Sequence, residues 1–201
     1  MLKLRKIAVT GGISSGKSLF CLYLKELGAF VVSADRIVHQ LLSPKTNLGK
    51  KVIKLLGPEV LTNNEINRDT IAQMVFNDSQ LLQSLEQILH PEVFLQIDKE
   101  YTEAKKQGAK LFVAEIPLLF EANGEAFFDA TVTITSDENR CIERFIKKTA
   151  RNEEQYHARM ARQLPQREKA ERANYVIYNN GSKEDLRVEA VNFFENILNW
   201  S

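Results

Sequence analysis

A glycine-rich string near the start of the chain constrains the fold more than any other feature. Residues 11–18 are Gly-Gly-Ile-Ser-Ser-Gly-Lys-Ser and satisfy the pattern G-x-x-x-x-G-K-[ST] in full. The string directly follows the apolar run 7–9, which is typical of a buried parallel strand. It precedes residues 19–27, where apolar side chains recur at helical spacing, and Gly28 is expected to end that helix. A strand, a glycine-rich turn and a helix in this order indicate a phosphate-binding loop.

Each residue type in this loop suits a phosphate chain. Glycines allow unusual backbone dihedrals and bring N–H groups close to phosphate oxygens. The helix that follows directs the positive end of its dipole at the same anion. Lys17 is suited to neutralise charge on the β- and γ-phosphates, and the Ser18 hydroxyl to ligate Mg²⁺. The residues predicted to bind the nucleotide in this segment are Gly12, Ser14, Ser15, Gly16, Lys17, Ser18 and Leu19.

Four more apolar runs continue the alternation of strands and helices. They cover residues 30–32, 111–114, 130–134 and 175–177, and a helix follows each of them sooner or later. The last helix is expected at 183–198, with a capping box that starts at Ser182. The pattern predicts an α/β fold of the P-loop nucleoside-triphosphate hydrolase kind, with a five-stranded parallel sheet and helices on both faces.

Two segments interrupt the alternation. Residues 48–107 are almost wholly helical in pattern, with Asn67 and Asp78 as N-caps and an expected helix break at His90-Pro91. This is too much helix for one crossover, so it indicates an inserted substrate domain. Residues 139–172 are also helical and densely charged. The nucleotide-binding core is therefore expected to comprise residues 1–47, 108–138 and 173–201.

Composition excludes several classes of protein. A net charge of +1 provides no field that would attract nucleic acid or an anionic membrane, and neither is expected as a partner. No apolar stretch approaches the roughly 20 residues of a membrane span, and the basic start has too few apolar residues after it for a signal peptide. Cys21 and Cys141 are isolated thiols and are expected to be reduced and at least partly buried. These features favour a cytoplasmic protein.

Absent motifs and one carboxylate separate kinases from other P-loop proteins. Neither Asn-Lys-x-Asp nor Asp-x-x-Gly, the strings expected of a GTPase, occurs in the chain. The second predicted strand ends in Ser33-Ala34-Asp35, which places Asp35 at the carboxyl edge of the sheet, where ligands of open α/β sheets bind. Asp35 is suited to accept a proton from an attacking hydroxyl or to hold a magnesium-bound water. Spacing alone favours a helix N-cap equally.

Five stretches of the chain resemble the dephospho-CoA kinase family and follow the family's order. They are Val9-Thr-Gly-Gly-Ile-Ser-Ser-Gly-Lys-Ser18, Ser33-Ala-Asp-Arg-Ile-Val38, Leu89-His-Pro91, Ile116-Pro-Leu-Leu-Phe-Glu121 and Ala173-Asn-Tyr-Val-Ile-Tyr-Asn-Asn-Gly181. The resemblance implies transfer of phosphate from ATP, with Mg²⁺, to the ribose 3′-hydroxyl of dephospho-CoA. It also implies that residues 48–107 form a helical CoA domain and residues 139–172 a mobile lid.

The resemblance also assigns roles to individual residues. Asp35 matches the family's catalytic carboxylate, and Arg144 matches an arginine that faces the ATP phosphates. With Lys17 these are the expected catalytic residues. The loop of Asn179 lies near the adenine ring in the family, so Asn179 is expected to hydrogen-bond the base, although turn chemistry alone also explains it. Lys148 is a weaker candidate for phosphate binding.

Three positions depart from the family pattern. Ser33 stands where the family often has aspartate, which affects a role for position 33 only. Leu19 follows Ser18 where the family usually has threonine, and its backbone N–H remains available. Tyr178 replaces a common aspartate and leaves the polar contacts of that loop open.

Several assignments remain open from the sequence. Glu115, at the end of the third predicted strand, either orients Mg²⁺ through water or is a packed carboxylate. Glu121 either contacts substrate or caps the next segment. His90 is a hinge, a substrate contact or a structural histidine, and without a second histidine or cysteine at ligand spacing it predicts no transition-metal site. One helical face of residues 139–172 carries a basic stripe, which is either solvated surface or phosphate-binding. Its members are Arg140, Arg144, Lys147, Lys148 and Arg151.

Two other functions compete with the leading one. The first is another small-molecule kinase acting on a nucleoside, a nucleotide or a shikimate-like alcohol. The second is an ATP-dependent switch, which the long helical insertion disfavours. A monomer or weak oligomer is expected in each case.

Overall fold

The computed structural model describes residues 4–76 and 78–200. The chain divides into two compact units. The first contains the chain up to Ser33 and from Tyr101 onward, and the second contains Ala34–Glu100. The first unit carries the phosphate-binding loop.

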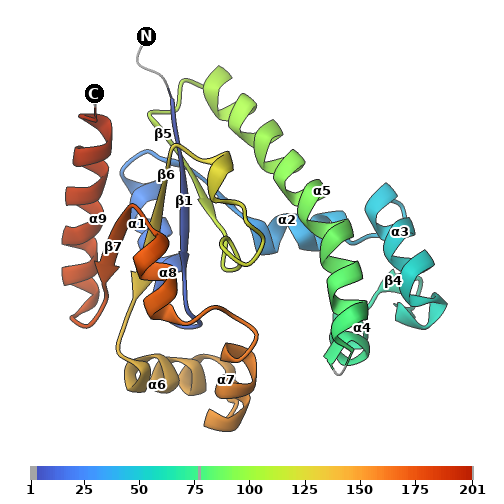
Figure 1. Cartoon of the computed structure of the whole chain (residues 1–201). Coiled ribbons are helices and arrows are strands. Elements are labelled where there is room, and N and C mark those ends of the chain that lie inside the picture. Colours follow the sequence, from blue (N-terminus) through green and yellow to red (C-terminus); the bar gives the residue numbers. More distant parts are fainter. Residues whose placement is uncertain (1–3, 77, 201) are drawn as a thin grey trace. The chain divides into compact units, whose positions relative to one another are not determined.

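The first unit is built on a five-stranded sheet (Figure 1). Its strands are β1 (Arg5–Gly11), β2 (Phe30–Ser33), β5 (Leu111–Glu115), β6 (Ala130–Thr135) and β7 (Tyr175–Tyr178). Their order is β2-β5-β1-β6-β7, and all four pairings are parallel. All five predicted strands are confirmed, and β1, which leads into the glycine-rich loop, is the central one.

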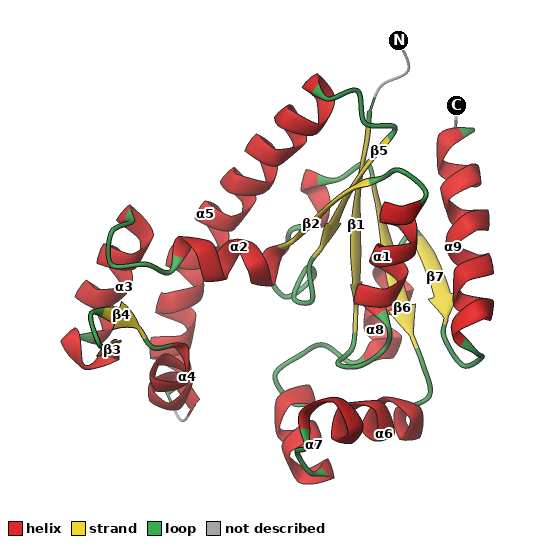
Figure 2. Ribbon diagram, turned by 180° about the vertical axis from the view of Figure 1, so that it is seen from behind, coloured by secondary structure: helices red, strands yellow, loops and turns green. Residues whose placement is uncertain are grey.

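Helices cover both faces of this sheet (Figures 1 and 2). On β6, Val132 and Ile134 point into the core shared with α1 (Lys17–Glu26) and α9 (Lys183–Leu198). The intervening Thr133 hydroxyl donates a hydrogen bond to the Lys169 carbonyl of α8 (Gln166–Arg172), on the opposite face. The predicted P-loop fold with a doubly covered parallel sheet is therefore confirmed.

The main core lies between the sheet and the pair α1 and α9. Phe20 of α1 is completely buried, and its ring lies 5.7 Å from that of Phe193 of α9. Cys21 and Cys141 are both buried and free, as predicted. The capping box of α9 is also present, because the Ser182 hydroxyl and the Asp185 carboxylate each accept a hydrogen bond from the other's backbone N–H.

Two further helices of the first unit are α6 (Glu138–Thr149) and α7 (Glu153–Met160), which lie beyond the carboxyl ends of the strands (Figure 1). One side of α6 is buried against Tyr156 of α7, with Ile13 of the glycine-rich loop packed against the same cluster. A short 3₁₀ helix, η2 (Glu125–Phe127), precedes β6. The predicted helical character of residues 139–172 is confirmed.

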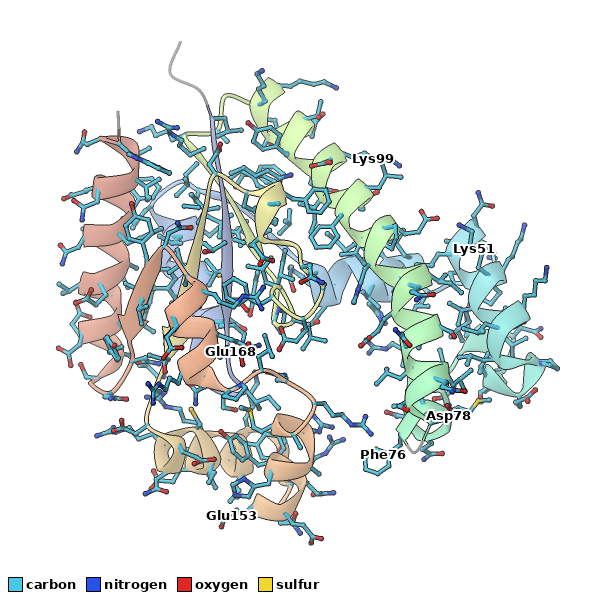
Figure 3. All side chains as sticks on the ribbon, viewed as in Figure 1. Lys51, Phe76, Asp78, Lys99, Glu153 and Glu168 are labelled. Atoms are coloured by element: carbon cyan, nitrogen blue, oxygen red, sulfur yellow. The ribbon has the colours of Figure 1, made fainter. Side chains whose placement is uncertain are left out.

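The second unit is mainly helical and has its own core. Its elements are α2 (Ala34–Leu41), α3 (Asn47–Leu56), η1 (Pro58–Val60), β3 (Leu61–Thr62), β4 (Glu65–Ile66), α4 (Arg68–Phe76) and most of α5 (Ser79–Lys106). The predicted N-caps are present. The Asn67 side chain accepts from two backbone N–H groups at the start of α4. Asp78, labelled in Figure 3, accepts from the N–H of Leu81. None of the helices in the described part of the chain is long and apolar enough to cross a membrane.

The prediction that residues 48–107 are almost wholly helical is confirmed for most of that segment, with one exception. The segment expected to be almost wholly helical contains a β-hairpin, β3–β4. Asn63 and Asn64 form its two-residue turn with φ of 52° and 62°, the left-handed values that a type I′ turn requires and that asparagine tolerates. The Asn63-Asn64 pair was the feature of the sequence that could have predicted this hairpin turn.

The expected break at His90-Pro91 is wrong, because α5 continues through the proline. Pro91 removes one backbone hydrogen bond from the helix. Apolar residues nevertheless recur every four residues on both sides of it, and Leu85, Val93 and Ile97 are all buried. Burial of this continuous face outweighs the loss of one hydrogen bond.

Candidate active site

The glycine-rich loop connects the carboxyl end of β1 with the start of α1, as predicted. Its backbone has positive φ at Gly11 (142°), Ser14 (57°) and Gly16 (109°). A Cβ at Gly16 would lie 2.1 Å from Nδ2 of Asn179, so this position requires glycine for its dihedral and for the space. The result is a tight turn whose N–H groups surround a small anion-binding concavity at a helix N-terminus.

Lys17 lies over this loop and is 8% exposed. Its ammonium donates hydrogen bonds to the carbonyl oxygens of Gly11 (3.0 Å) and Gly12 (2.6 Å). These contacts hold the charge at the mouth of the loop, where the phosphate chain of a nucleotide is bound in proteins with this motif.

The two predicted metal ligands lie in contact. The Ser18 hydroxyl donates a 2.6 Å hydrogen bond to Oε1 of Glu115, the last residue of β5. Ser18 is exposed and Glu115 half-buried. A hydroxyl and a carboxylate at this edge form the hard oxygen donor set that Mg²⁺ prefers. No cluster of three or more histidine, cysteine or acidic side chains occurs among residues 4–76 and 78–200.

Cys21 lies on α1 near this pair. Burial and the Glu115 carboxylate raise the pKa of the Cys21 thiol well above its ordinary value. The thiol is therefore protonated at neutral pH and is not a nucleophile.

Asn179 lies beneath the loop. It is 6% exposed, and its Nδ2 donates a 2.7 Å hydrogen bond to the carbonyl of Ser15. The side chain that the sequence assigned to the adenine base is thus directed at the backbone of the phosphate-binding loop.

Arg144 of α6 contacts the backbone of Asn179 and the neighbouring Ser136, and these residues together with the phosphate-binding loop form one polar cluster. Its guanidinium donates to the Ser136 hydroxyl (3.2 Å) and to the backbone carbonyl of Asn179 (3.0 Å). The rest of the basic stripe behaves differently: the Arg140, Lys147, Lys148 and Arg151 residues are exposed. Arg140 makes a loose ion pair with Asp137, at 3.8 Å.

Two residues of this cluster were missed by the sequence prediction. The Ser136 hydroxyl also donates to the Asn179 carbonyl at 2.8 Å. Gln166, at the start of α8, accepts hydrogen bonds from Thr135 Oγ1 and from the Ser136 N–H. Its Cγ would lie 2.9 Å from a Cβ at Gly12, so Gln166 closes one side of the loop. The sequence carried no signal for either residue beyond its position near a strand or helix end.

Glu121 makes an internal ion pair. Its Oε1 lies 2.8 Å from Nζ of Lys169, which is completely buried, and also accepts from the N–H of Leu164. Lys169 donates in addition to the carbonyl of Pro117 at 2.8 Å. Burial lowers the pKa of the Lys169 ammonium, and the Glu121 carboxylate offsets part of that effect. The sequence did not predict a buried role for Lys169, because it lies in a densely charged helical segment of the kind that is usually exposed to solvent.

Asp35 and His90 belong to the second unit. Asp35 is the second residue of α2 and is exposed, and within the described residues its carboxylate accepts no hydrogen bond. The N-cap position of α2 falls on Ser33, the last residue of β2, which pairs with Glu115 in the sheet. An acidic residue in the first turn still suits the helix dipole. His90 is half-buried within α5.

The sheet order, the glycine-rich loop and the Ser18–Glu115 pair define a P-loop protein that binds a nucleoside triphosphate. The sequence model of the dephospho-CoA kinase family matches residues 5–185, so the chain belongs to that family. A dephospho-CoA kinase of Protochlamydia amoebophila is 48% identical over 191 residues, which cover 93% of each chain. One of Chlamydia abortus is 46% identical over 195 residues, 96% of each.

Solved structures resemble the chain over nearly its full length. TT1252 from Thermus thermophilus has a TM-score of 0.83 and 31% identity, over 96% of this chain and 98% of its own. Dephospho-CoA kinase from Campylobacter jejuni has a TM-score of 0.70 and 27% identity, over 95% and 96%. A shikimate kinase from Acinetobacter baumannii, at 15% identity and a TM-score of 0.53, shares the fold alone.

Proposed function

We propose that this protein transfers the γ-phosphoryl group of ATP to the ribose 3′-hydroxyl of dephospho-CoA, giving coenzyme A and ADP in the final step of coenzyme A synthesis. The observation that carries the proposal is family membership across residues 5–185. The phosphate-binding loop with its Ser18–Glu115 pair supplies the matching chemistry. No comparable support exists for a shikimate-like acceptor, because the shikimate kinase likeness lies in the fold alone.

The loop is assigned to the phosphate chain of ATP. Gly12, Ser14, Ser15 and Gly16 contribute backbone N–H groups, and Leu19 contributes the N–H of the first helical turn. Lys17 exchanges its contacts with the loop carbonyls for contacts with phosphate oxygens. Its charge then lies where negative charge shifts as the γ-phosphoryl group leaves ADP.

Ser18 and Glu115 are assigned to Mg²⁺, and their contact fits a small hard cation. A bound Mg²⁺ would supply positive charge that neutralises the phosphate chain. The protein's own part is to hold the hydroxyl and the carboxylate at one edge of the sheet.

Asp35 is assigned as the group that orients the acceptor hydroxyl and accepts its proton. Its exposed carboxylate has no hydrogen-bond partner within the described residues, so it is available to a substrate. We assign the helical segment 48–107 to binding dephospho-CoA. The compact second unit, Ala34–Glu100, contains most of that segment.

Arg144 is assigned to the ATP phosphates and residues 139–172 to a lid. Lys169 of α8 is completely buried in an ion pair, and α8 packs on the sheet. We therefore assign any closing movement to α6 and α7, with Lys148 as a further phosphate contact.

The proposal extends to the protein's setting. We propose a cytoplasmic monomer or weak oligomer without nucleic-acid or membrane partners. Two buried free thiols suit a reducing compartment, and a net charge of +1 suits small-molecule substrates.

ADP release measured with and without dephospho-CoA tests the function. We expect release only when ATP, Mg²⁺ and dephospho-CoA are all present, with a product heavier than dephospho-CoA by one phosphate. Shikimate, nucleosides and nucleoside monophosphates serve as competing acceptors. Faster turnover on any of these would overturn the acceptor assignment, and release without an acceptor would favour a switch.

A further inference from the structure

The Asn179 side chain already has a partner inside the protein. Its Nδ2 donates to the Ser15 carbonyl at 2.7 Å, although the two residues lie 164 positions apart in the chain. Only 6% of Asn179 is exposed. A side-chain amide that reads an adenine ring must reach the base, whereas this side chain is buried and directed at the phosphate-binding loop.

This contact sets the orientation of one peptide group in the phosphate-binding loop. In a trans peptide the carbonyl and the N–H of the next residue point in opposite directions. When Asn179 holds the Ser15 carbonyl on the protein side, the Gly16 N–H is directed to the other side of the loop, where an anion binds. Gly16 has φ of 109° and no Cβ, so the residue itself restricts this peptide little and a contact from outside the loop helps to keep one orientation.

Asn179 is itself held at three backbone contacts. Its N–H donates to the Thr135 carbonyl at 2.8 Å, at the end of β6. Its carbonyl accepts from the Ser136 hydroxyl at 2.8 Å and from Arg144 at 3.0 Å. The side chain therefore extends from a fixed backbone, as a restraint on the loop requires.

We infer that Asn179 is a positioning residue for the phosphate-binding loop, and that it does not read the nucleotide base. The inference deepens the proposed function and rests on it for the identity of the nucleotide. Loss of the amide leaves the Ser15 carbonyl without its buried donor and frees the Ser15–Gly16 peptide to rotate. Affinity for phosphate groups falls, whatever base is attached to them.

The test compares ligands that share phosphates but differ in the base. Calorimetry with Mg²⁺ measures binding of ADP, GDP and inorganic tripolyphosphate to the wild type, Asn179→Ala and Asn179→Asp. We expect about 10–100-fold weaker binding of all three to Asn179→Ala, from the usual cost of an unsatisfied buried carbonyl. Asn179→Asp has the same shape but places an oxygen against the Ser15 carbonyl, so binding should weaken at least as much. The ratio of ADP to GDP affinity should stay within about threefold of the wild-type ratio.

Asn174→Ala is the matched control. Asn174 accepts two hydrogen bonds from Thr131 and joins β6 to the opposite end of β7. The Asn174→Ala substitution should lower the melting temperature and leave the affinities for ADP, GDP and tripolyphosphate unchanged. Folding of each variant is checked by circular dichroism, and the isosteric Asn179→Asp provides the folded variant if Asn179→Ala unfolds.

Two results would overturn the inference. One is a change in the ADP to GDP ratio with unchanged tripolyphosphate binding, which would make Asn179 a base-reading residue. The other is unchanged binding of all three ligands to both Asn179 variants. Because no acceptor is present, these results stay separate from a failure of the proposed acceptor, which ADP release on the wild type would reveal.

Discussion

The buried ion pair between Lys169 and Glu121 makes a quantitative prediction about stability. Lys169→Met keeps most of the side-chain volume and removes the ammonium, which is completely buried and lies 2.8 Å from Oε1 of Glu121. The Glu121 carboxylate then keeps one hydrogen-bond donor, the N–H of Leu164, on its Oε1. Its Oε2 is already buried and has no hydrogen-bond partner within the described residues. The Pro117 carbonyl also loses a donor.

Removing one member of a buried pair costs about 3–5 kcal/mol, because the other charge is left buried without compensation. We therefore expect Lys169→Met to lower the free energy of unfolding of the first unit by about 3–5 kcal/mol. Lys169→Met combined with Glu121→Gln leaves no charge and keeps an acceptor for Leu164. The double variant should cost about 1–2 kcal/mol relative to wild type.

Urea denaturation followed by the fluorescence of Trp200, the single tryptophan, provides the assay. Trp200 reports on the first unit, since Arg5 of β1 stacks on its ring and donates to its carbonyl. Lys110→Met is the control: Lys110 is exposed and belongs to the first unit, and its loss should cost less than about 0.5 kcal/mol. A double variant no more stable than Lys169→Met would refute the argument from the uncompensated charge.

The same residue predicts a dependence on pH. Burial lowers the pKa of Lys169 in the folded state below its ordinary value of 10.5, so the unfolded chain binds more protons between the two values. Stability from this group must therefore rise as pH increases through that window. We expect the difference in unfolding free energy between wild type and Lys169→Met to grow from neutral pH toward about 10. If the difference in unfolding free energy instead shrinks over this range, the ion pair with Glu121 raises the pKa of Lys169 by more than desolvation lowers it.

Three further predictions concern activity. Lys17→Ala should lower kcat by about 10²–10³ with the fold intact by circular dichroism, and near-normal turnover would remove the loop lysine from the mechanism. Asp35→Asn should lower kcat by about 10²–10⁴ while changing stability by less than about 1 kcal/mol, whereas full activity with a lower melting temperature would make Asp35 a structural residue only. Amide exchange in α6 and α7 should slow when an ATP analogue and dephospho-CoA are added, with α8 unaffected, and equal exchange in both states would exclude a lid.

Much of the fold was predictable because its signals are local. The strands at 7–9 and 111–114 are apolar runs bounded by charged or glycine residues, and the capping box at Ser182 depends on residues three positions apart. The failures also have local causes. Pro91 lacks a backbone donor, which predicts a helix end, but the buried face of α5 extends on both sides of it. Asn63-Asn64 favours a type I′ turn, and the surrounding helical pattern concealed it.

The candidate site was predictable in part, for a related reason. Lys17 and Ser18 belong to one short motif whose chemistry requires those residue types in that spacing. Glu115 was a candidate because it ends a predicted strand, where P-loop proteins commonly place an acidic residue. Gln166 and Lys169 were not found, because their functional neighbours come from distant parts of the chain.

The sequence by itself therefore determined that this chain carries a P-loop at the end of a buried strand, within a parallel α/β fold of the dephospho-CoA kinase family. Periodicity and motif spacing act over a few residues, and a single chain displays them directly. Only the tertiary structure decided the strand order and which polar groups meet. The Ser18–Glu115 contact spans 97 positions and the Asn179–Ser15 contact 164. Such pairs depend on strand register and on the packing of whole helices against the sheet, which no local pattern specifies.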